Sequence, residues 1–270
     1  MAPNFQAAGT VVANTAGANV AWPTHIADDV GALIIEYDSN GGIDPSGLTG
    51  FTQFTGSPIK TGTTPATATA LSVWWRRATG STESDVAVPD CGNHFVARIA
   101  TIRGCIASGD PFNVVSSGAF SDTENTSQSI PGATTTLEDC LVLLLCVNGG
   151  NFTTNAWSSL ANADLSSLTD QASFHDTIGS GGGSLVATGV KASSGTYGTT
   201  TVTSQRTSAE ASISIAFKPP VSVGQPTLVR TQGVPTGAGH KDRPGRWNFK
   251  CWPGWSRRKS GLLAPAGVCT

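Results

Sequence analysis

The chain has 270 residues with a charged fraction of only 13%, and it contains 32 glycines and 15 prolines. Gly, Pro, Ser, Thr and Asp form helices poorly, whereas Thr, Val and Ile fit a half-buried strand. The composition therefore excludes a mainly helical protein and predicts an all-β fold. A chain of this length buries roughly 70% or more of its unfolded surface, as one large sandwich or as two small ones.

Charge is divided unevenly along the chain. The net charge of −2 argues against a general binder of polyanions, and we do not expect nucleic acid as a partner. Residues 1–219 carry 8 Lys or Arg against 17 Asp or Glu, whereas residues 220–270 carry 8 against 1. The last fifth of the chain is therefore basic, while the rest is acidic.

No segment has the composition of a membrane span or a secretory signal. The longest apolar run, Leu141 to Val147, is much shorter than the ~20 residues that cross a bilayer. The first ten residues, MAPNFQAAGT, lack both a basic start and an apolar stretch. We therefore expect neither a membrane partner nor export by the Sec pathway.

Turn-forming sequences divide the chain into short strands. In chain order, strands are predicted at 29–37, 70–80, 94–102, 139–147, 184–195 and 209–217. Leu141 to Val147 is apolar at every position and is predicted to be a central strand covered on both faces. The last strand alternates apolar and polar residues, which predicts one buried face and one wet face carrying Glu210, Ser212 and Ser214.

These strands form an internal repeat. Asp29 to Tyr37 matches Asp139 to Val147, and the strands that follow match in the same order, at an offset of roughly 110 residues. The repeat units are about 29–105 and 139–219. Two sheets that each bury one face pack on each other, so we predict one jelly-roll-like β-sandwich of two similar halves at 29–219. It follows an N-terminal segment, residues 1–28.

Residues 220–270 are predicted to form an extended C-terminal arm. They follow a Pro-Pro break and combine aromatic with basic side chains, and they have little means of building a core of their own. We expect the arm to dock on the body or on a neighbouring subunit; the alternative is a disordered basic tail. The candidate interface residues are Trp247, Phe249, Trp252, Trp255, Arg243, Arg246, Arg257 and Arg258.

The six cysteines show no metal-binding spacing. There is no Cys-x-x-Cys pair and no Cys/His pattern of a zinc site, so no metal is expected. Cys140 and Cys146 would lie ~20 Å apart on one strand, too far to bridge each other, and are predicted to be small core residues. Cys251 and Cys269, in the arm, are candidates for a disulfide within or between chains.

The four histidines do not form a catalytic pattern. His25 precedes the first predicted core strand beside two acids, His94 opens a strand, and His240 lies in the arm. His175 and Asp176 are neighbours on a strand and point to opposite faces, which does not suit a Ser-His-Asp relay. We expect structural roles for these side chains.

Sequence motifs for hydrolases and nucleotide-binding proteins are also missing. Gly179 to Ser184 has the glycines of a phosphate loop without the strand before it and the helix after it, and it is predicted to be a hairpin turn. The acidic pairs Asp28/Asp29 and Glu138/Asp139 occupy equivalent positions before the two central strands, which indicates hydrogen bonds to the local backbone. We expect no catalytic residue and no cofactor.

The densest local feature is Trp74-Trp75-Arg76-Arg77. On a strand, Trp75 shares the core face with Val73, and Trp74 lies with Arg76 on the opposite face. An exposed Trp beside Arg stacks on a sugar or a base, or covers a subunit interface. Trp74 and Arg76 are therefore candidate ligand or interface residues.

Residues 29–105 resemble a loosely defined group of tailed-bacteriophage virion proteins. The resemblance is carried by Asp29 to Tyr37, Gly50-Phe51-Thr52, Ala70 to Ala78, and His94 to Gly104. The second repeat unit matches weakly and the arm does not match. The resemblance implies a β-sandwich on a phage particle, assembled in the cytoplasm of the bacterial host, and it supplies no catalytic signature.

The sequence thus leads to the hypothesis of a non-enzymatic structural protein of a tailed-phage virion, either a head decoration or cement protein or a tail, neck or fibre protein. Its partners would be other virion proteins and copies of itself, for example in a trimer. The alternative is a carbohydrate-binding or host-attachment module, with Trp22, Trp74 and Trp157 as candidate contacts to a host glycan. A glycan-active enzyme would need paired carboxylates, for which Asp44, Glu83 and Glu124 are the candidates.

Overall fold

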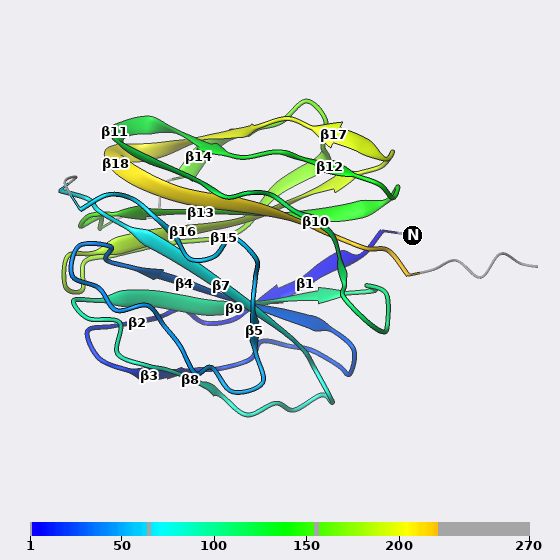
Figure 1. Cartoon of the computed structure of the whole chain (residues 1–270), viewed down its shortest axis with the longest axis horizontal. Coiled ribbons are helices and arrows are strands. Elements are labelled where there is room, and N and C mark those ends of the chain that lie inside the picture. Colours follow the sequence, from blue (N-terminus) through cyan, green and yellow to red (C-terminus); the bar gives the residue numbers. More distant parts are fainter. Residues whose placement is uncertain (1, 64–65, 154–156, 221–270) are drawn as a thin grey trace, which may run out of the picture. The chain divides into compact units, whose positions relative to one another are not determined.

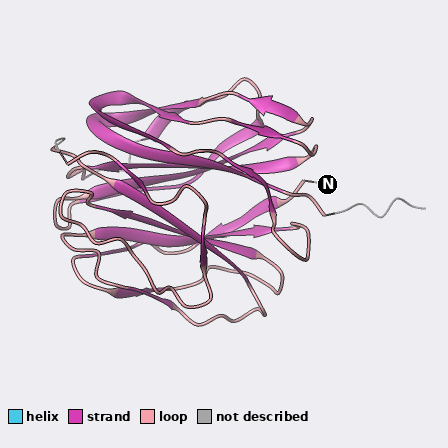
Figure 2. Cartoon of the chain, viewed as in Figure 1, coloured by secondary structure: helices cyan, strands magenta, loops and turns pink. Residues whose placement is uncertain are grey.

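The computed structural model describes residues 2–63, 66–153 and 157–220. These residues form strands and loops without any helix, which confirms the all-β prediction (Figure 2). They belong to one compact unit. The eight candidate interface residues of the arm, the Cys251 and Cys269 pair, and His240 lie outside the described residues.

The first half of the chain builds one antiparallel sheet, here called the first sheet. Its strands are β1 (Asn4–Ala8), β2 (Val12–Asn14), β4 (Val30–Tyr37), β5 (Thr52–Gln53), β6 (Ile59–Lys60), β7 (Ala70–Arg77) and β9 (Phe95–Arg103). The strand order is β1-β9-β4-β7-β5, with β2 beside β9 and β6 beside β7. A separate ribbon pairs β3 (Ala18–Val20) with β8 (Val86–Val88).

The second half repeats this arrangement in the second sheet. Its strands are β10 (Phe112–Val115), β11 (Ala119–Ile130), β13 (Cys140–Gly149), β14 (Trp157–Ala161), β15 (Ser166–Asp176), β16 (Gly182–Lys191) and β18 (Thr200–Phe217). The order is β10-β18-β13-β16-β15, and β11 and β14 also pair with β18. A second ribbon pairs β12 (Ala133–Thr135) with β17 (Gly195–Tyr197).

The five strands in the main order of each sheet correspond one to one, so the predicted sandwich of two similar halves is confirmed (Figure 1). The two ribbons also take equivalent places in the chain. β3 and β8 come directly before β4 and β9, and β12 and β17 come directly before β13 and β18. The jelly-roll-like topology is not confirmed, because the long strands of each half stay within one sheet instead of alternating between the two sheets.

The alignment of the repeat inferred from the sequence is wrong by one residue. It pairs Leu33 with Leu143, but Leu143 faces the space between the sheets and Leu33 faces the outer side of the first sheet. A shift of one residue, which pairs Ala32 with Leu143, brings the core faces into agreement, since successive strand residues point to opposite faces. Asp28 and Asp139 then become equivalent, and both have a positive φ, 70° and 55°.

Three apolar layers hold the described residues together. The layer between the two sheets contains Val30, Ala32 and Ile34 from β4 and Leu141, Leu143 and Leu145 from β13. A second layer lies between the first sheet and the β3–β8 ribbon, and a third covers the outer face of the second sheet beneath the β12–β17 ribbon (Figure 1). Every residue of β13 is buried, as predicted for a central strand.

Cys140 and Cys146 have free thiols and lie in the third apolar layer, as predicted for core residues. Burial raises the pKa of both thiols, to about 11 for Cys140. Both side chains therefore act as small hydrophobic groups in this layer.

The polar face of β18 is buried, contrary to the prediction of a wet face. Glu210 is 5% exposed, and Ser212 and Ser214 are fully buried. The end of β11 and the residue after it supply hydrogen-bond acceptors: Ser212 Oγ donates to the Ser129 carbonyl at 2.8 Å and Ser214 Oγ to the Pro131 carbonyl at 2.6 Å. The predicted alternation of apolar and polar residues along β18 was correct. The polar face does not need solvent, however, because other protein groups accept its hydrogen bonds.

We predict that Leu143→Ala lowers the free energy of unfolding by about 2–5 kcal/mol, because it opens a cavity between the two sheets. Urea denaturation followed by tryptophan fluorescence measures the change. The matched control is Leu137→Ala, since Leu137 is 41% exposed and should change stability by no more than about 0.5 kcal/mol. Equal losses in both variants would contradict this description of the core.

Candidate functional site

The two central strands end at the same end of the sandwich, which we call the carboxyl end. A Cβ atom on Gly182, at the start of β16, would lie 2.1 Å from Glu36 Oε2 of β4. A Cβ atom on Gly149, at the end of β13, would lie 2.4 Å from the Thr67 carbonyl just before β7. A side chain at Gly149 would clash with backbone, and a side chain at Gly182 would displace the Glu36 carboxyl group, so the two halves meet closely here.

A buried polar cluster occupies the carboxyl end. Glu36 on β4 and His94 just before β9 are 0% and 1% exposed. His94 Nε2 lies 3.1 Å from Glu36 Oε2, and His94 Nδ1 lies 3.0 Å from Ser180 Oγ in the turn between β15 and β16. Ser180 belongs to the second half of the chain, so His94 links the two halves of the sandwich.

Further polar groups complete this carboxyl-end cluster. Thr69 Oγ1 donates a hydrogen bond of 2.8 Å to Glu36 Oε1. Asn93 Nδ2 donates to Ser180 Oγ at 2.9 Å and to Asp38 Oδ2 at 3.2 Å. The cluster therefore satisfies most of the hydrogen-bonding groups that the meeting of the two halves buries.

Glu36 and His94 face each other in a buried site and change each other's pKa. Burial is the largest influence on Glu36 and raises its pKa, although His94 opposes this rise. Burial alone would lower the pKa of His94, but the charge and hydrogen bond of Glu36 outweigh it, and the pKa of His94 is raised. The arrangement can hold a proton between the carboxylate and the imidazole and orient the Ser180 hydroxyl.

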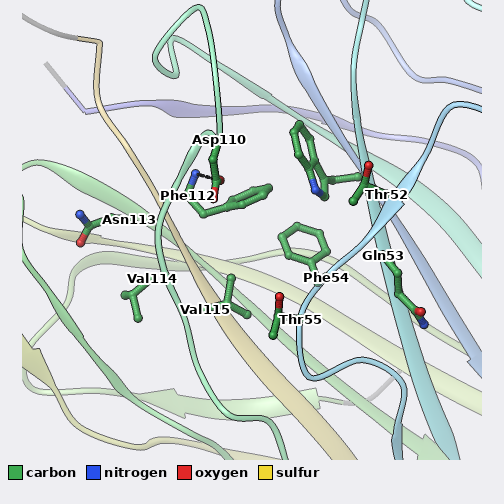
Figure 3. A pocket seen from close by; sticks show the side chains of 10 residues that line it. Thr52, Gln53, Phe54, Thr55, Asp110, Phe112, Asn113, Val114 and Val115 are labelled. Atoms are coloured by element: carbon green, nitrogen blue, oxygen red, sulfur yellow. Dashed lines mark hydrogen bonds between the residues drawn. The ribbon is translucent and has the colours of Figure 1, made fainter.

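A cleft of about 500 Å³ lies near the other end of the sandwich, between β5 of the first sheet and β10 of the second (Figure 3). It is lined by Thr52, Gln53, Phe54, Thr55, Trp75, Asp110, Phe112, Asn113, Val114 and Val115. β5 and β10 end the strand orders of their sheets, so the cleft opens along one side of the sandwich.

Aromatic rings form the inner wall of this cleft. The Phe112 ring lies 4.6 Å from Phe54, 5.0 Å from Trp75 in an edge-to-face contact, and 5.3 Å from Phe217. Phe54 and Phe112 are buried, whereas Trp75 is half-buried and packs against the layer between the sheets, as predicted. The cleft thus combines apolar ring surface with the hydroxyl-bearing side chains of Thr52 and Thr55.

Trp74 and Arg76 lie on the face opposite Trp75, as predicted, but Trp74 is half-buried and not exposed. Trp74 packs against the outer layer of the first sheet and donates its indole N–H to Ser72 Oγ at 2.8 Å. Arg76 lies over the Trp22 ring at 5.5 Å and pairs with Glu83. The Trp74 indole N–H and the Arg76 guanidinium, which a ligand would need, are thus both bound within the chain.

The other candidate tryptophans are also engaged within the body. Trp22 is half-buried, packs near His25 at 5.1 Å and is covered by Arg76. Trp157 stacks on His175 at 5.3 Å with an interplanar angle of 18°. His175 Nε2 lies 3.2 Å from Asn148 Oδ1, and burial lowers the pKa of His175 to about 4. Neither ring presents a free stacking platform.

The three candidate carboxylates have separate partners. Asp44 pairs with Lys60 and accepts a hydrogen bond from Tyr37, and Glu83 pairs with Arg76. Glu124 accepts hydrogen bonds from the backbone and the hydroxyl of Thr67 at 3.0 Å and 2.9 Å. The structure thus places each of them in a different cluster and does not bring them together as a dyad.

The acidic residues before the central strands have structural roles. Asp29 accepts the Ile26 N–H at 2.9 Å and a paired contact from the Arg103 guanidinium, at 2.9 Å from Nε and 2.8 Å from Nη2. This agrees with the predicted hydrogen bonds to the local backbone. Asp28 and Asp139 donate equivalent backbone hydrogen bonds, to Ala78 at 2.9 Å and to Ala192 at 3.0 Å.

The predicted hairpin turn at the glycine-rich segment is confirmed. It joins β15 to β16, with a hydrogen bond of 2.9 Å from Gly181 N–H to the Ile178 carbonyl. Within the described ranges, no group of three or more His, Cys, Asp or Glu side chains is arranged to hold a metal ion. In the same part of the chain, no helix is long and apolar enough to cross a membrane.

Comparison of the chain with protein-family models, with curated proteins and with solved structures gave no match.

The carboxyl-end cluster was not found from the sequence. Glu36 and His94 are 58 residues apart, and His94 and Ser180 are 86 residues apart, on three different elements. No local spacing connects them, so the only signals were a Glu inside an apolar strand and a glycine-rich turn. Only the pairing of the two halves brings them within hydrogen-bond distance.

We predict that the body loses stability as the pH rises above neutral. The stabilisation from protonated His94 is complete below its ordinary pKa of 6.5 and is lost as the pH rises through the raised value. Glu36 acts in the same direction, because its raised pKa makes ionisation above pH 4.5 costly in the folded state. Circular dichroism should show a smaller fall in melting temperature between about pH 7 and pH 9 for Glu36→Gln than for the wild type.

The control for this measurement is Glu138→Gln, at an exposed position just before β13. It should follow the wild-type pH profile. An unchanged profile in the Glu36→Gln variant would show that the buried pair does not control the alkaline loss of stability.

Proposed function

We propose that this chain is a non-enzymatic structural component of a tailed-phage virion, either a head decoration or cement protein or a tail, neck or fibre component. Assembly with copies of itself, and with other virion proteins, takes place through the C-terminal arm. The proposal rests on the resemblance of residues 29–105 to phage virion proteins and on the division of charge between an acidic body and a basic arm.

The observation that carries the assembly role is the way the body holds its last described residues. Lys218 N–H donates to the Pro111 carbonyl at 2.7 Å, and Lys218 Nζ donates to the Asp110 carbonyl at 3.0 Å. Asp110 also lines the cleft beside β10. The chain therefore leaves the body at a fixed point on the side of the sandwich.

The length and chemistry of the remaining chain suit contact with a neighbour. Residues 221–270 span at most about 170 Å when fully extended, far more than one small domain. Their basic and aromatic side chains complement a body with 17 acidic and 8 basic residues. An arm from each subunit placed on the next subunit closes a symmetric ring, of which a trimer is the simplest example.

We predict that full-length protein forms an oligomer and that a chain ending at Pro219 is a folded monomer. Light scattering coupled to size-exclusion chromatography measures both masses, and circular dichroism verifies the β-structure of the shorter chain. A full-length variant with Arg243, Arg246, Arg257 and Arg258 changed to Ala tests charge at constant length and should also dissociate. An oligomer that persists in the shorter chain would refute the role of the arm.

A second candidate function is carbohydrate binding at the cleft, for example of a host glycan. The observation in its favour is the combination of the Trp75 indole with the hydroxyl groups of Thr52 and Thr55 in the lining of the cleft. Protein sites for sugars use this mixture, because sugar rings have both apolar faces and hydroxyl edges.

A glycan array distinguishes the two candidate functions. If the cleft binds sugar, Trp75→Leu should abolish the signal and Trp74→Leu, on the opposite face, should preserve it. Circular dichroism shows whether both variants remain folded. A wild-type chain that binds no glycan would leave only the structural function, and a signal lost in Trp74→Leu alone would place the glycan on the other face.

A further inference from the structure

The carboxyl-end cluster contains a serine, a histidine and a carboxylate in series. Ser180 Oγ lies 3.0 Å from His94 Nδ1, and His94 Nε2 lies 3.1 Å from Glu36 Oε2. When His94 is neutral, its Nε2 proton is held by Glu36, and the lone pair of Nδ1 faces the Ser180 hydroxyl. The more distant contact of Ser180 Oγ to Asp38 Oδ2, 3.5 Å, makes His94 the better acceptor.

We propose that Ser180, His94 and Glu36 form a nucleophilic relay through which Ser180 accepts an acyl group from a small activated ester. The roles follow from chemistry that requires a hydroxyl, a base in contact with it, and a third group that orients the base. The two ring nitrogens have exchanged positions relative to the serine-protease arrangement, in which Nε2 faces the serine. The relay is unaffected, since either nitrogen of imidazole can accept a proton while the other donates one.

The fold presents the serine and hides its partners. Ser180 is half-buried in the β15–β16 turn between Gly179 and Gly181, whose φ angles of 64° and 74° favour glycine. His94 and Glu36 are 1% and 0% exposed. A reagent can therefore approach Ser180 from the turn while the base remains shielded from water.

The surroundings of Ser180 define the class of acyl donor. Asn93 Nδ2 donates to Ser180 Oγ at 2.9 Å and to Asp38 Oδ2 at 3.2 Å, and it would have to exchange one of these bonds to donate to the oxygen of an attacked carbonyl. Ile178, in the same turn, is 40% exposed. Ile43, whose N–H bonds to the Cys91 carbonyl near Asn93, is 59% exposed. A small ester with an aliphatic or aryl group is the acyl donor that suits these exposed apolar side chains.

The acylation step balances without a cofactor. The Ser180 hydroxyl proton passes to His94 Nδ1 as Oγ forms a bond to the carbonyl carbon. The tetrahedral intermediate then collapses, the bond from carbon to the leaving oxygen breaks, and the leaving group takes the proton or departs as an anion. The product is an ester of Ser180, and nothing is oxidised or reduced.

The step requires neutral His94 and therefore depends on pH. The acidic groups that act on His94 are Glu36 from β4, Asp38 from the loop after β4, and Asp176 from the end of β15, and all of them raise its pKa. Acylation should therefore increase as the pH rises above 6.5, the ordinary value for histidine. Removal of the Glu36 charge should move this increase to lower pH.

The test is incubation of the full-length protein with p-nitrophenyl acetate, followed by intact mass spectrometry and peptide mapping. One acetyl group should appear on Ser180, and the rate of p-nitrophenolate release should fall at least about tenfold in Ser180→Ala, the lower end of the effect of losing a catalytic group. The matched control is Ser193→Ala, at an exposed position between β16 and β17, which should behave as the wild type. Glu36→Gln, verified by circular dichroism, should shift the pH midpoint of acetylation downward.

Two results would overturn the proposal: no acetylation of Ser180, or equal rates in wild type and Ser180→Ala. An unshifted pH midpoint in folded Glu36→Gln would overturn the role of Glu36 as a positioning residue. The outcome is independent of the proposed assembly function, because oligomeric mass is measured separately. A stable single acetyl group is compatible with a structural protein, whereas continued turnover would support the relay and refute the non-enzymatic function.

Discussion

Burial of both faces of β4 and β13 is the constraint on which the rest of the structure depends. All eight residues of β4 and all ten of β13 are buried, so each strand needs one layer beneath it and another above. The two sheets supply the inner layer for each other. The outer layers come from the short β3–β8 ribbon in one half and from β12, β17 and neighbouring loops in the other. In both halves, the central strand is therefore covered on one face by the other sheet and on the other face by an outer layer.

That packing makes the carboxyl end an unusual environment for charge. Glu36 is the acidic residue inside β4, and it points into the space between the two sheets, where a carboxylate without partners would be costly. His94 and Thr69 supply hydrogen bonds from the first half, and the glycines of the β15–β16 turn allow the second half to approach closely. Replacing a buried ion pair with apolar residues of similar volume is often neutral or stabilising. Stability is therefore a weak reason for the presence of the Glu36–His94 pair.

The other end of the sandwich is lined by aromatic side chains and not by a buried ion pair. There the aromatic cleft lies between the edge strands β5 and β10, and Lys218 is held beside it by hydrogen bonds from its N–H to the Pro111 carbonyl and from its Nζ to the Asp110 carbonyl. The buried polar cluster and the point where Lys218 is held thus lie at opposite ends of the same two central strands. A change at one end leaves the contacts of the other intact, which separates the two proposals physically.

Local patterns in the sequence determined the all-β class, the repeat, the central strand 141–147 and the hairpin at the glycine-rich turn, because strand propensity, alternation and turn formation act over a few residues. They could not determine which polar faces become buried, since the exposed face expected for Glu210, Ser212 and Ser214 is covered by a segment about 80 residues earlier. They also could not fix the register of the repeat to one residue. Only the tertiary structure brought Glu36, His94 and Ser180 together, because hydrogen bonds between distant segments depend on how the two sheets stack.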